Sequence, residues 1–211
     1  MGYLVEGLYI LAVVALSFAL HRFFKVPSHV TRKLTHILIG FVFIIQYHYF
    51  REEALGLLLL PSIITVGLFL VARFRLVESM VNPENPYGIF YYALAITLSN
   101  AVACFYPPYL GAAGTAIFCL SFGDGFAALL AGAFPKRHRL YGAKSIEGSL
   151  ICFFFSVAGM VILGLFFPAL MLSPLVLFGA AALATVLELF TGRFDNPAIV
   201  FGVGIFVVLL G

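Results

Sequence analysis

The sequence predicts an all-α, polytopic integral membrane protein, a bundle of about eight transmembrane helices that forms a single membrane domain over residues 1–211. Hydrophobic residues make up 63% of the chain and charged residues only 10%, whereas soluble domains carry roughly 25% charged residues. The mean hydropathy is +1.12. Apolar runs of about 20 residues, the length that crosses a bilayer, recur along the chain.

Eight apolar runs are expected to be membrane spans. In chain order they cover residues 3–24, 34–50, 54–72, 87–106, 110–133, 149–167, 172–190 and 197–210. The last run is short and glycine-rich, so seven spans is the alternative. We expect the first run to remain as a span rather than to be cleaved as a signal peptide, because no Lys or Arg precedes it and its apolar stretch is too long.

The basic residues are distributed unevenly between the expected loops. Of the twelve Lys and Arg residues, all except Arg51 lie in or beside the loops that follow the first, third, fifth and seventh spans. The positive-inside rule therefore places these loops in the cytoplasm and both termini outside. We expect no nucleic-acid partner. The three cysteines form no CxxC pair, so a metal–thiolate site and a disulfide are both poor interpretations.

Asp124 is the first candidate functional residue. It lies between Gly123 and Gly125 inside an apolar run, where a carboxylate is costly and is a functional candidate by default. In a straight helix it would lie about 14 Å from the end of its span. Alternatively, the two glycines would break the helix and line a cavity that opens to the cytoplasm. A structural aspartate paired with a basic residue is the plainer interpretation.

The segment from Lys144 to Ser149 suits a phosphate group, although it contains no P-loop motif. Lys144 would act as a point charge on the phosphate, and backbone amides near Gly148 would add donors. Glu147 would orient Lys144 or contact the nucleotide. The plainer interpretation is a helix start that is capped by Ser145 and Ser149.

Arg32, Lys33 and His36 are spaced to share one helix face at the start of the second expected span. Cations are unfavourable at a helix N-terminus, which favours a bound polyanion there. A positive-inside anchor is the alternative. His36 on its own is more often a hydrogen-bonded structural residue than a catalyst.

Glu188, Asp195 and Asn196 form the last group. Asp and Asn before Pro197 are ordinary helix-start residues. A carboxylate inside a span with a second one seven residues later is less ordinary. With Asp124, these carboxylates could hold one or two Mg²⁺ ions, because Mg²⁺ prefers oxygen ligands.

Four segments together resemble a known family. RKLTH, SFGDGFAALLAG, KSIEGS and ELFTGRFDN, in this order on a polytopic chain, are similar to the CTP-dependent polyprenol kinases, which include phytol kinase, dolichol kinase and CTP-dependent diacylglycerol kinase. The resemblance runs from about Arg32 to Pro197. The basic loop PKRHRLYGAK departs from the family pattern.

The resemblance implies a membrane enzyme that transfers the γ-phosphoryl group of CTP to a lipid hydroxyl, with its active site on the cytoplasmic face. The acceptor would be an isoprenoid alcohol of the phytol, geranylgeraniol or polyprenol type, or diacylglycerol. Expected metal ligands are Asp124, Glu188 and Asp195. Expected nucleotide contacts are Arg32, Lys33, Lys144, Glu147, Gly148, Ser149 and Asn196.

Asp124 or His36 would be the catalytic base, with Asp124 preferred, and Lys144 completes the expected catalytic set. Two alternatives remain open. One is cytidylyl transfer to phosphatidate, which releases pyrophosphate. The other is a small-solute transporter with ion sites at Asp124 and Glu188, although no inverted repeat supports it. The sequence does not give the oligomeric state.

Overall fold

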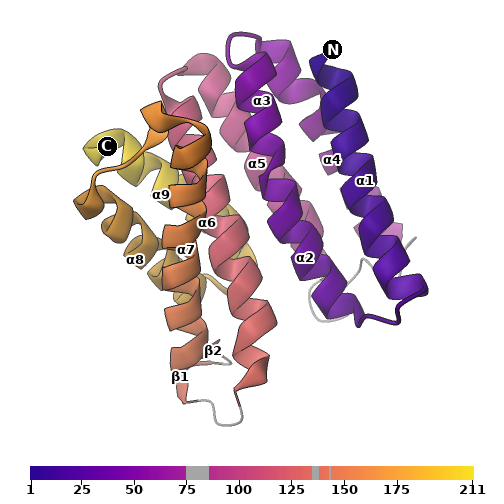
Figure 1. Ribbon diagram of the computed structural model, residues 1–211, viewed down its shortest axis with the longest axis vertical. Coiled ribbons are helices and arrows are strands. Elements are labelled where there is room, and N and C mark those ends of the chain that lie inside the picture. The colour runs from indigo at the N-terminus through magenta and orange to yellow at the C-terminus, as the bar shows by residue number, and fades with distance from the viewer. Residues whose placement is uncertain (75–85, 135–137, 143) are drawn as a thin grey trace. The chain divides into compact units, whose positions relative to one another are not determined.

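The computed structural model describes residues 1–74, 86–134, 138–142 and 144–211, and nearly all of the regular structure in these ranges is helical. Figure 1 shows the helices in chain order. They are α1 (Gly2–Arg22), α2 (Ser28–Gly40), α3 (Val42–Phe50), α4 (Ala54–Phe74), α5 (Gly88–Phe105), α6 (Tyr109–Leu130), α7 (Ile146–Phe166), α8 (Pro174–Phe190) and α9 (Asp195–Leu210). Short 3₁₀ segments are η2 (Ala131–Ala133), η3 (Pro168–Leu170) and η4 (Gly192–Phe194), and the strands are β1 (Arg139–Tyr141) and β2 (Lys144–Ser145).

The all-α, multi-pass membrane class is confirmed. Within the described ranges, seven helical segments are long and apolar enough to cross a membrane. The expected span at 172–190 corresponds to α8, which is apolar but only 17 residues long. The second expected span is interrupted at Phe41, which separates α2 from α3, and α2 begins at Ser28 rather than at residue 34.

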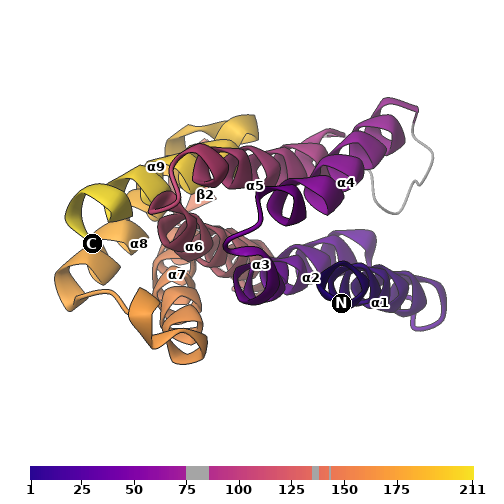
Figure 2. The same cartoon turned by 90° about the horizontal axis from the view of Figure 1, so that it is seen from above.

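The chain divides into two compact units, unit 1 (Met1–Leu110) and unit 2 (Gly111–Gly211). In unit 1, α1 packs along α2 and α3, and α4 packs along α5 (Figures 1 and 2). Polar contacts join these pairs: the Tyr9 hydroxyl donates to the Leu38 carbonyl at 2.7 Å, and the Thr65 and Thr97 hydroxyls are 2.8 Å apart. The expectation of a single domain remains a prediction.

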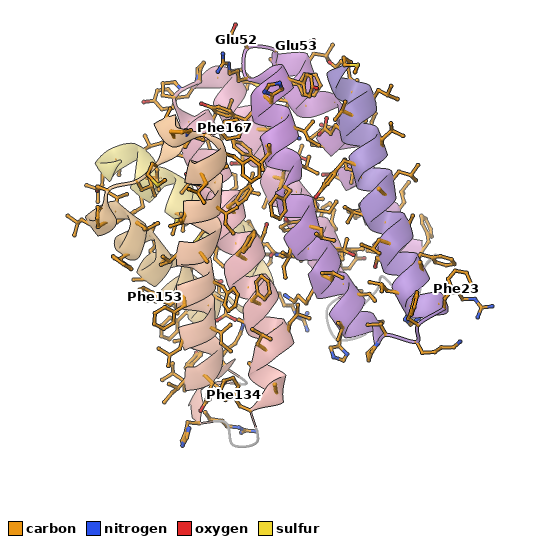
Figure 3. The ribbon with its side chains drawn as sticks, in the orientation of Figure 1. Phe23, Glu52, Glu53, Phe134, Phe153 and Phe167 are labelled. Carbon is orange, nitrogen blue, oxygen red and sulfur yellow. The ribbon has the colours of Figure 1, made fainter. Side chains whose placement is uncertain are left out.

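In unit 2, α7 packs against both α6 and α8, and α9 packs against α8 (Figure 1). Two glycines bring α6 and α7 close. A Cβ at Gly159 would lie 2.7 Å from the Phe118 carbonyl oxygen, and one at Gly123 would lie 2.2 Å from Ser156 Oγ. The short β1–β2 pair lies at one end of α7 near Phe134, and Phe167 lies at the other end (Figure 3).

Candidate functional site

Asp124 lies on a continuous helix. The helix α6 runs from Tyr109 to Leu130 without a break at Gly123 or Gly125, so the alternative in which the glycines interrupt the helix does not occur. The role of Gly123 is instead steric, because the Ser156 hydroxyl on α7 occupies the place where a side chain would project. Asp124 is only 6% exposed. The structure therefore keeps the carboxylate buried beside the contact of α6 with α7.

Lys144 is brought back toward the helices by a two-stranded antiparallel pair. Arg139 pairs with Ser145 and Tyr141 pairs with Lys144. Gly142 turns the chain between the strands with φ +55°, a conformation that favours glycine. From this position the Lys144 ammonium donates to the carboxylate of Glu188 on α8. This contact joins two segments that are 44 residues apart in the sequence.

Three carboxylates act on the Lys144 ammonium. Burial alone would lower the pKa of Lys144, but the charge and hydrogen bond of Glu188, with the charges of Asp124 and Asp195, raise its pKa above the usual value. Lys144 therefore carries its positive charge at neutral pH. With three acidic groups around one ammonium, this part of unit 2 attracts further positive charge. We call Asp124, Lys144, Glu188 and Asp195 the carboxylate–lysine cluster.

Glu147 lies in the first turn of α7 and binds His138, not Lys144. Its carboxylate accepts the His138 backbone N–H at 3.1 and 3.2 Å and contacts the His138 ring Nδ1 at 2.7 Å. The Ile146 amide also donates to the His138 carbonyl at 2.9 Å. Among the described residues Glu147 thus contacts His138 and not Lys144, and its expected contact with the nucleotide remains a prediction. Glu147 fixes the chain that precedes β1, and so holds the strand pair that carries Lys144.

The start of α7 follows the capping interpretation. Ser145 is the N-cap, and its Oγ accepts the Gly148 amide at 3.2 Å. The Gly148 amide is thus engaged by the cap, which removes it from the set of donors expected for phosphate. Ser149 does not cap, and its Oγ is buried with no hydrogen-bond partner among the described residues. Its expected contact with the nucleotide remains a prediction.

Asp195 and Asn196 open α9, as expected for residues at a helix start. Asp195 Oδ1 accepts the Asn196 backbone N–H at 2.8 Å. Asn196 is 7% exposed, while Asp195 is less buried and adds its charge to that of Glu188 near Lys144. The structure therefore places Asp195 in the carboxylate–lysine cluster, and Asn196 next to it in the chain.

Arg32, Lys33 and His36 lie in unit 1, on α2, whereas the cluster lies in unit 2. Because α2 begins at Ser28, Arg32 is already beyond its first turn, where the helix dipole acts. The start of α2 at Ser28 therefore removes the helix-dipole reason for a polyanion at Arg32 and Lys33, and their expected contact with the nucleotide remains a prediction. The His36 ring stacks on Tyr92 with centroids 3.8 Å apart, and the Tyr92 hydroxyl donates to the His36 carbonyl at 2.9 Å. These contacts favour a structural role for His36.

The residue types of the cluster suit a hard divalent cation, because its three acidic members offer only carboxylate oxygens. Across the described parts of the chain, no group of three or more His, Cys, Asp or Glu side chains is arranged to hold a metal ion. Glu188 is already bound to Lys144.

The basic residues Arg75, Lys136 and Arg137, which were predicted to face the cytoplasm from the charge bias, lie outside the described residues.

Two features of the molecule were missed by sequence reasoning. His138 was interpreted only as part of a basic loop. Its spacing from Glu147, with a glycine between them, is a signal for a hairpin whose two ends are joined by a His–Glu contact. Glu6 was used only to reject a signal peptide, yet it is fully buried with Gln46 and Asn100. Intramembrane Gln and Asn beside a Glu are the signal that would have found this second polar group.

Comparison with known proteins adds no relative. No protein-family model, no curated protein and no solved structure matches the chain. The functional argument therefore depends on the carboxylate–lysine cluster, on the multi-pass architecture and on the four sequence segments that resemble the CTP-dependent polyprenol kinases.

Proposed function

We propose that this protein is a membrane lipid kinase that transfers the γ-phosphoryl group of CTP to the hydroxyl of an isoprenoid alcohol or of diacylglycerol. The observation that carries the proposal is the contact of Lys144 with Glu188, at a place where the charges of Asp124 and Asp195 also raise the pKa of Lys144. These residues come from α6, α8, α9 and β2, and all four lie in three of the segments that carry the family resemblance. A cation amid acidic groups at a membrane is what a triphosphate with its metal requires.

In the proposed reaction, the oxygen of the lipid hydroxyl attacks the γ-phosphorus, the bond from that phosphorus to the β–γ bridging oxygen breaks, and CDP leaves. Asp124 accepts the proton of the hydroxyl. Lys144 binds the phosphate oxygens and reduces their charge. Glu147, through His138, holds the strand pair so that Lys144 stays at the cluster. Positioning and charge neutralisation are thus the main work of the protein.

Asp124, Glu188 and Asp195 are the residues that would hold Mg²⁺. Bound together with CTP, the ion would supply charge neutralisation at the transferring phosphoryl group. The contact of Lys144 with Glu188 supports coupled binding of CTP and Mg²⁺, because each ligand would bind one member of this pair. If Lys144 bound a phosphate instead, the carboxylate of Glu188 would be free to hold the ion.

Cytidylyl transfer to phosphatidate is the second candidate, because it uses the same nucleotide, the same type of metal ligands and a membrane lipid. The two reactions differ in the phosphorus that is attacked. A small-solute transporter with ion sites at Asp124 and Glu188 remains the alternative of another class.

The experiment that tests the proposal uses the purified full-length protein in detergent with CTP, Mg²⁺ and a panel of lipid alcohols. Mass spectrometry reads both the lipid and the nucleotide products. The kinase predicts a lipid monophosphate and CDP in equal amounts. A CDP-linked lipid with pyrophosphate indicates the transferase, and no nucleotide turnover with any acceptor contradicts both enzymatic candidates. The matched inactive control is Lys144→Ala.

A further inference from the structure

A chain of buried polar side chains joins α1, α3, α4 and α5 inside unit 1. Glu6, Gln46 and Asn100 are each 0% exposed. Gln46 Nε2 donates to Glu6 Oε1 at 2.8 Å, and Asn100 Nδ2 donates to Gln46 Oε1 at 3.1 Å and to the Leu57 carbonyl at 2.9 Å. The lipid kinase proposed above makes no use of these residues.

The direction of these hydrogen bonds is fixed by the Leu57 carbonyl. A carbonyl only accepts, so the amino group of Asn100 must face it. The same amino group then donates to Gln46, which turns the Gln46 amino group toward Glu6. Both N–H bonds of Asn100 are used in this way, one for Leu57 and one for Gln46.

Four further oxygens of unit 1 are buried. Glu6 Oε2 and Asn100 Oδ1 have no hydrogen-bond partner among the residues that the structure describes. Ser99 precedes Asn100 on α5, and its buried hydroxyl is hydrogen-bonded to the buried hydroxyl of Tyr109. Both hydroxyl oxygens keep a lone pair that this bond does not use. Unpaired polar oxygens and a desolvated carboxylate are both costly within a membrane span, so their joint presence points to an occupant with positive charge.

We propose that these oxygens form a binding site for one alkali-metal cation of about the size of Na⁺, with Glu6 supplying the balancing charge. A proton on Glu6 Oε2 would pair with a single acceptor, whereas a metal cation binds several oxygens at once. One carboxylate with neutral amide and hydroxyl oxygens suits a monovalent ion, because divalent ions usually draw more carboxylates.

The site lies near one end of unit 1. Glu6 is in the second turn of α1, Gln46 is one turn before the end of α3 and Asn100 is near the end of α5. The exposed carboxylates Glu52 and Glu53 lie at this same end, between α3 and α4 (Figure 3).

The test measures the unfolding midpoint of the purified full-length protein in NaCl, LiCl or KCl, with N-methylglucamine chloride at equal ionic strength as the reference. We expect saturating NaCl to raise the midpoint by about 4 °C over the reference, and Glu6→Gln to lose this response. Glu52→Gln, which removes an exposed carboxylate at the same end, should keep it. The result that would overturn the site is equal midpoints of the wild-type protein in all four salts.

A second measurement keeps the test decisive if Glu6→Gln does not fold. Radioactive sodium is bound to the wild-type protein, and its stoichiometry is measured directly. The site predicts about one ion per chain, displaced by unlabelled Na⁺ and weakened at least several-fold in Ser99→Ala. Absence of saturable sodium binding to the wild-type protein would show that a proton or nothing occupies the site at Glu6 and would overturn the proposal.

Discussion

At the scale of single residues, Asp124 is the group on which the proposed chemistry depends most. It is a buried carboxylate on an unbroken helix, and its charge acts on Lys144. We expect Asp124→Asn to lower kcat/KM for CTP by about 100-fold or more, because the change keeps the shape but removes the charge that holds the metal and accepts the proton.

The control for Asp124→Asn is Glu52→Gln, which neutralises an exposed carboxylate outside the cluster. Both proteins should elute as monodisperse detergent complexes with similar unfolding midpoints. An Asn variant that turns over CTP at the wild-type rate would make Asp124 structural and would shift the metal to Glu188 and Asp195.

Lys144 is expected to bind phosphate and therefore to be exchanged from its contact with Glu188 when CTP arrives. We predict that Lys144→Ala lowers kcat/KM for CTP by about 100-fold, since a charge-assisted contact to the transferring phosphate is lost. Arg139→Ala is the matched control, because Arg139 is an exposed cation on the neighbouring strand. Equal losses in the two variants, measured by CDP release, would reduce Lys144 to a general contribution of positive charge.

At the scale of elements, the contact between α6 and α7 determines where Asp124 lies. A Cβ at Gly159 would come within 2.7 Å of the Phe118 carbonyl oxygen, whereas a Cβ at Gly132 would meet nothing within 4 Å. We expect Gly159→Ala to destabilise the protein by about 1–3 kcal/mol through overpacking, and Gly132→Ala to have little effect. Thermal unfolding in detergent measures both variants. Equal unfolding midpoints of Gly159→Ala and Gly132→Ala would show that α6 and α7 accommodate the added methyl group without loss of stability, and would contradict the prediction.

The same elements show why sequence reasoning located spans better than contacts. Apolar length alone predicts α4, α5 and α7, because lipid requires a run of apolar residues. It did not predict the interruption at Phe41, nor the start of α2 at Ser28, where Pro27 is the N-cap. From the sequence, Gly123 and Gly125 were compatible with either a continuous or an interrupted helix. The close packing of Ser156 explains why residue 123 is a glycine in a continuous helix.

The partners of charged residues were the least predictable part of the candidate site. Lys144, Glu147 and Glu188 were each selected as candidates from their residue type and position. Their pairing was not, because Lys144 meets Glu188 across 44 residues and Glu147 meets His138 across a turn. Pairing of this kind is set by tertiary structure, which a single sequence does not encode in any local pattern. Gln46 and Asn100 were missed although both are polar residues inside apolar runs, which is a signal that the sequence does contain.

At the scale of the whole molecule, the distribution of basic residues predicts that His138 faces the cytoplasm and Arg51 the opposite side. In a Cys104→Ser background, an impermeant thiol reagent added to intact cells should label Glu52→Cys and should label His138→Cys only after the cells are opened. Cys119 and Cys152 are buried and should react slowly. Ready labelling of His138→Cys in intact cells would place the cluster on the side away from cytosolic nucleotides.

The proposed lipid kinase passes a phosphoryl group, and not a cytidylyl group, from CTP to a lipid. Purified protein with Mg²⁺ and the acceptor lipid is given CTP labelled either at the γ-phosphorus or at the α-phosphorus. The lipid kinase predicts that γ-label enters the lipid while α-label stays in soluble CDP, and that Asp124→Asn abolishes the transfer. Entry of α-label into the lipid, with release of labelled pyrophosphate from γ-labelled CTP, would contradict it.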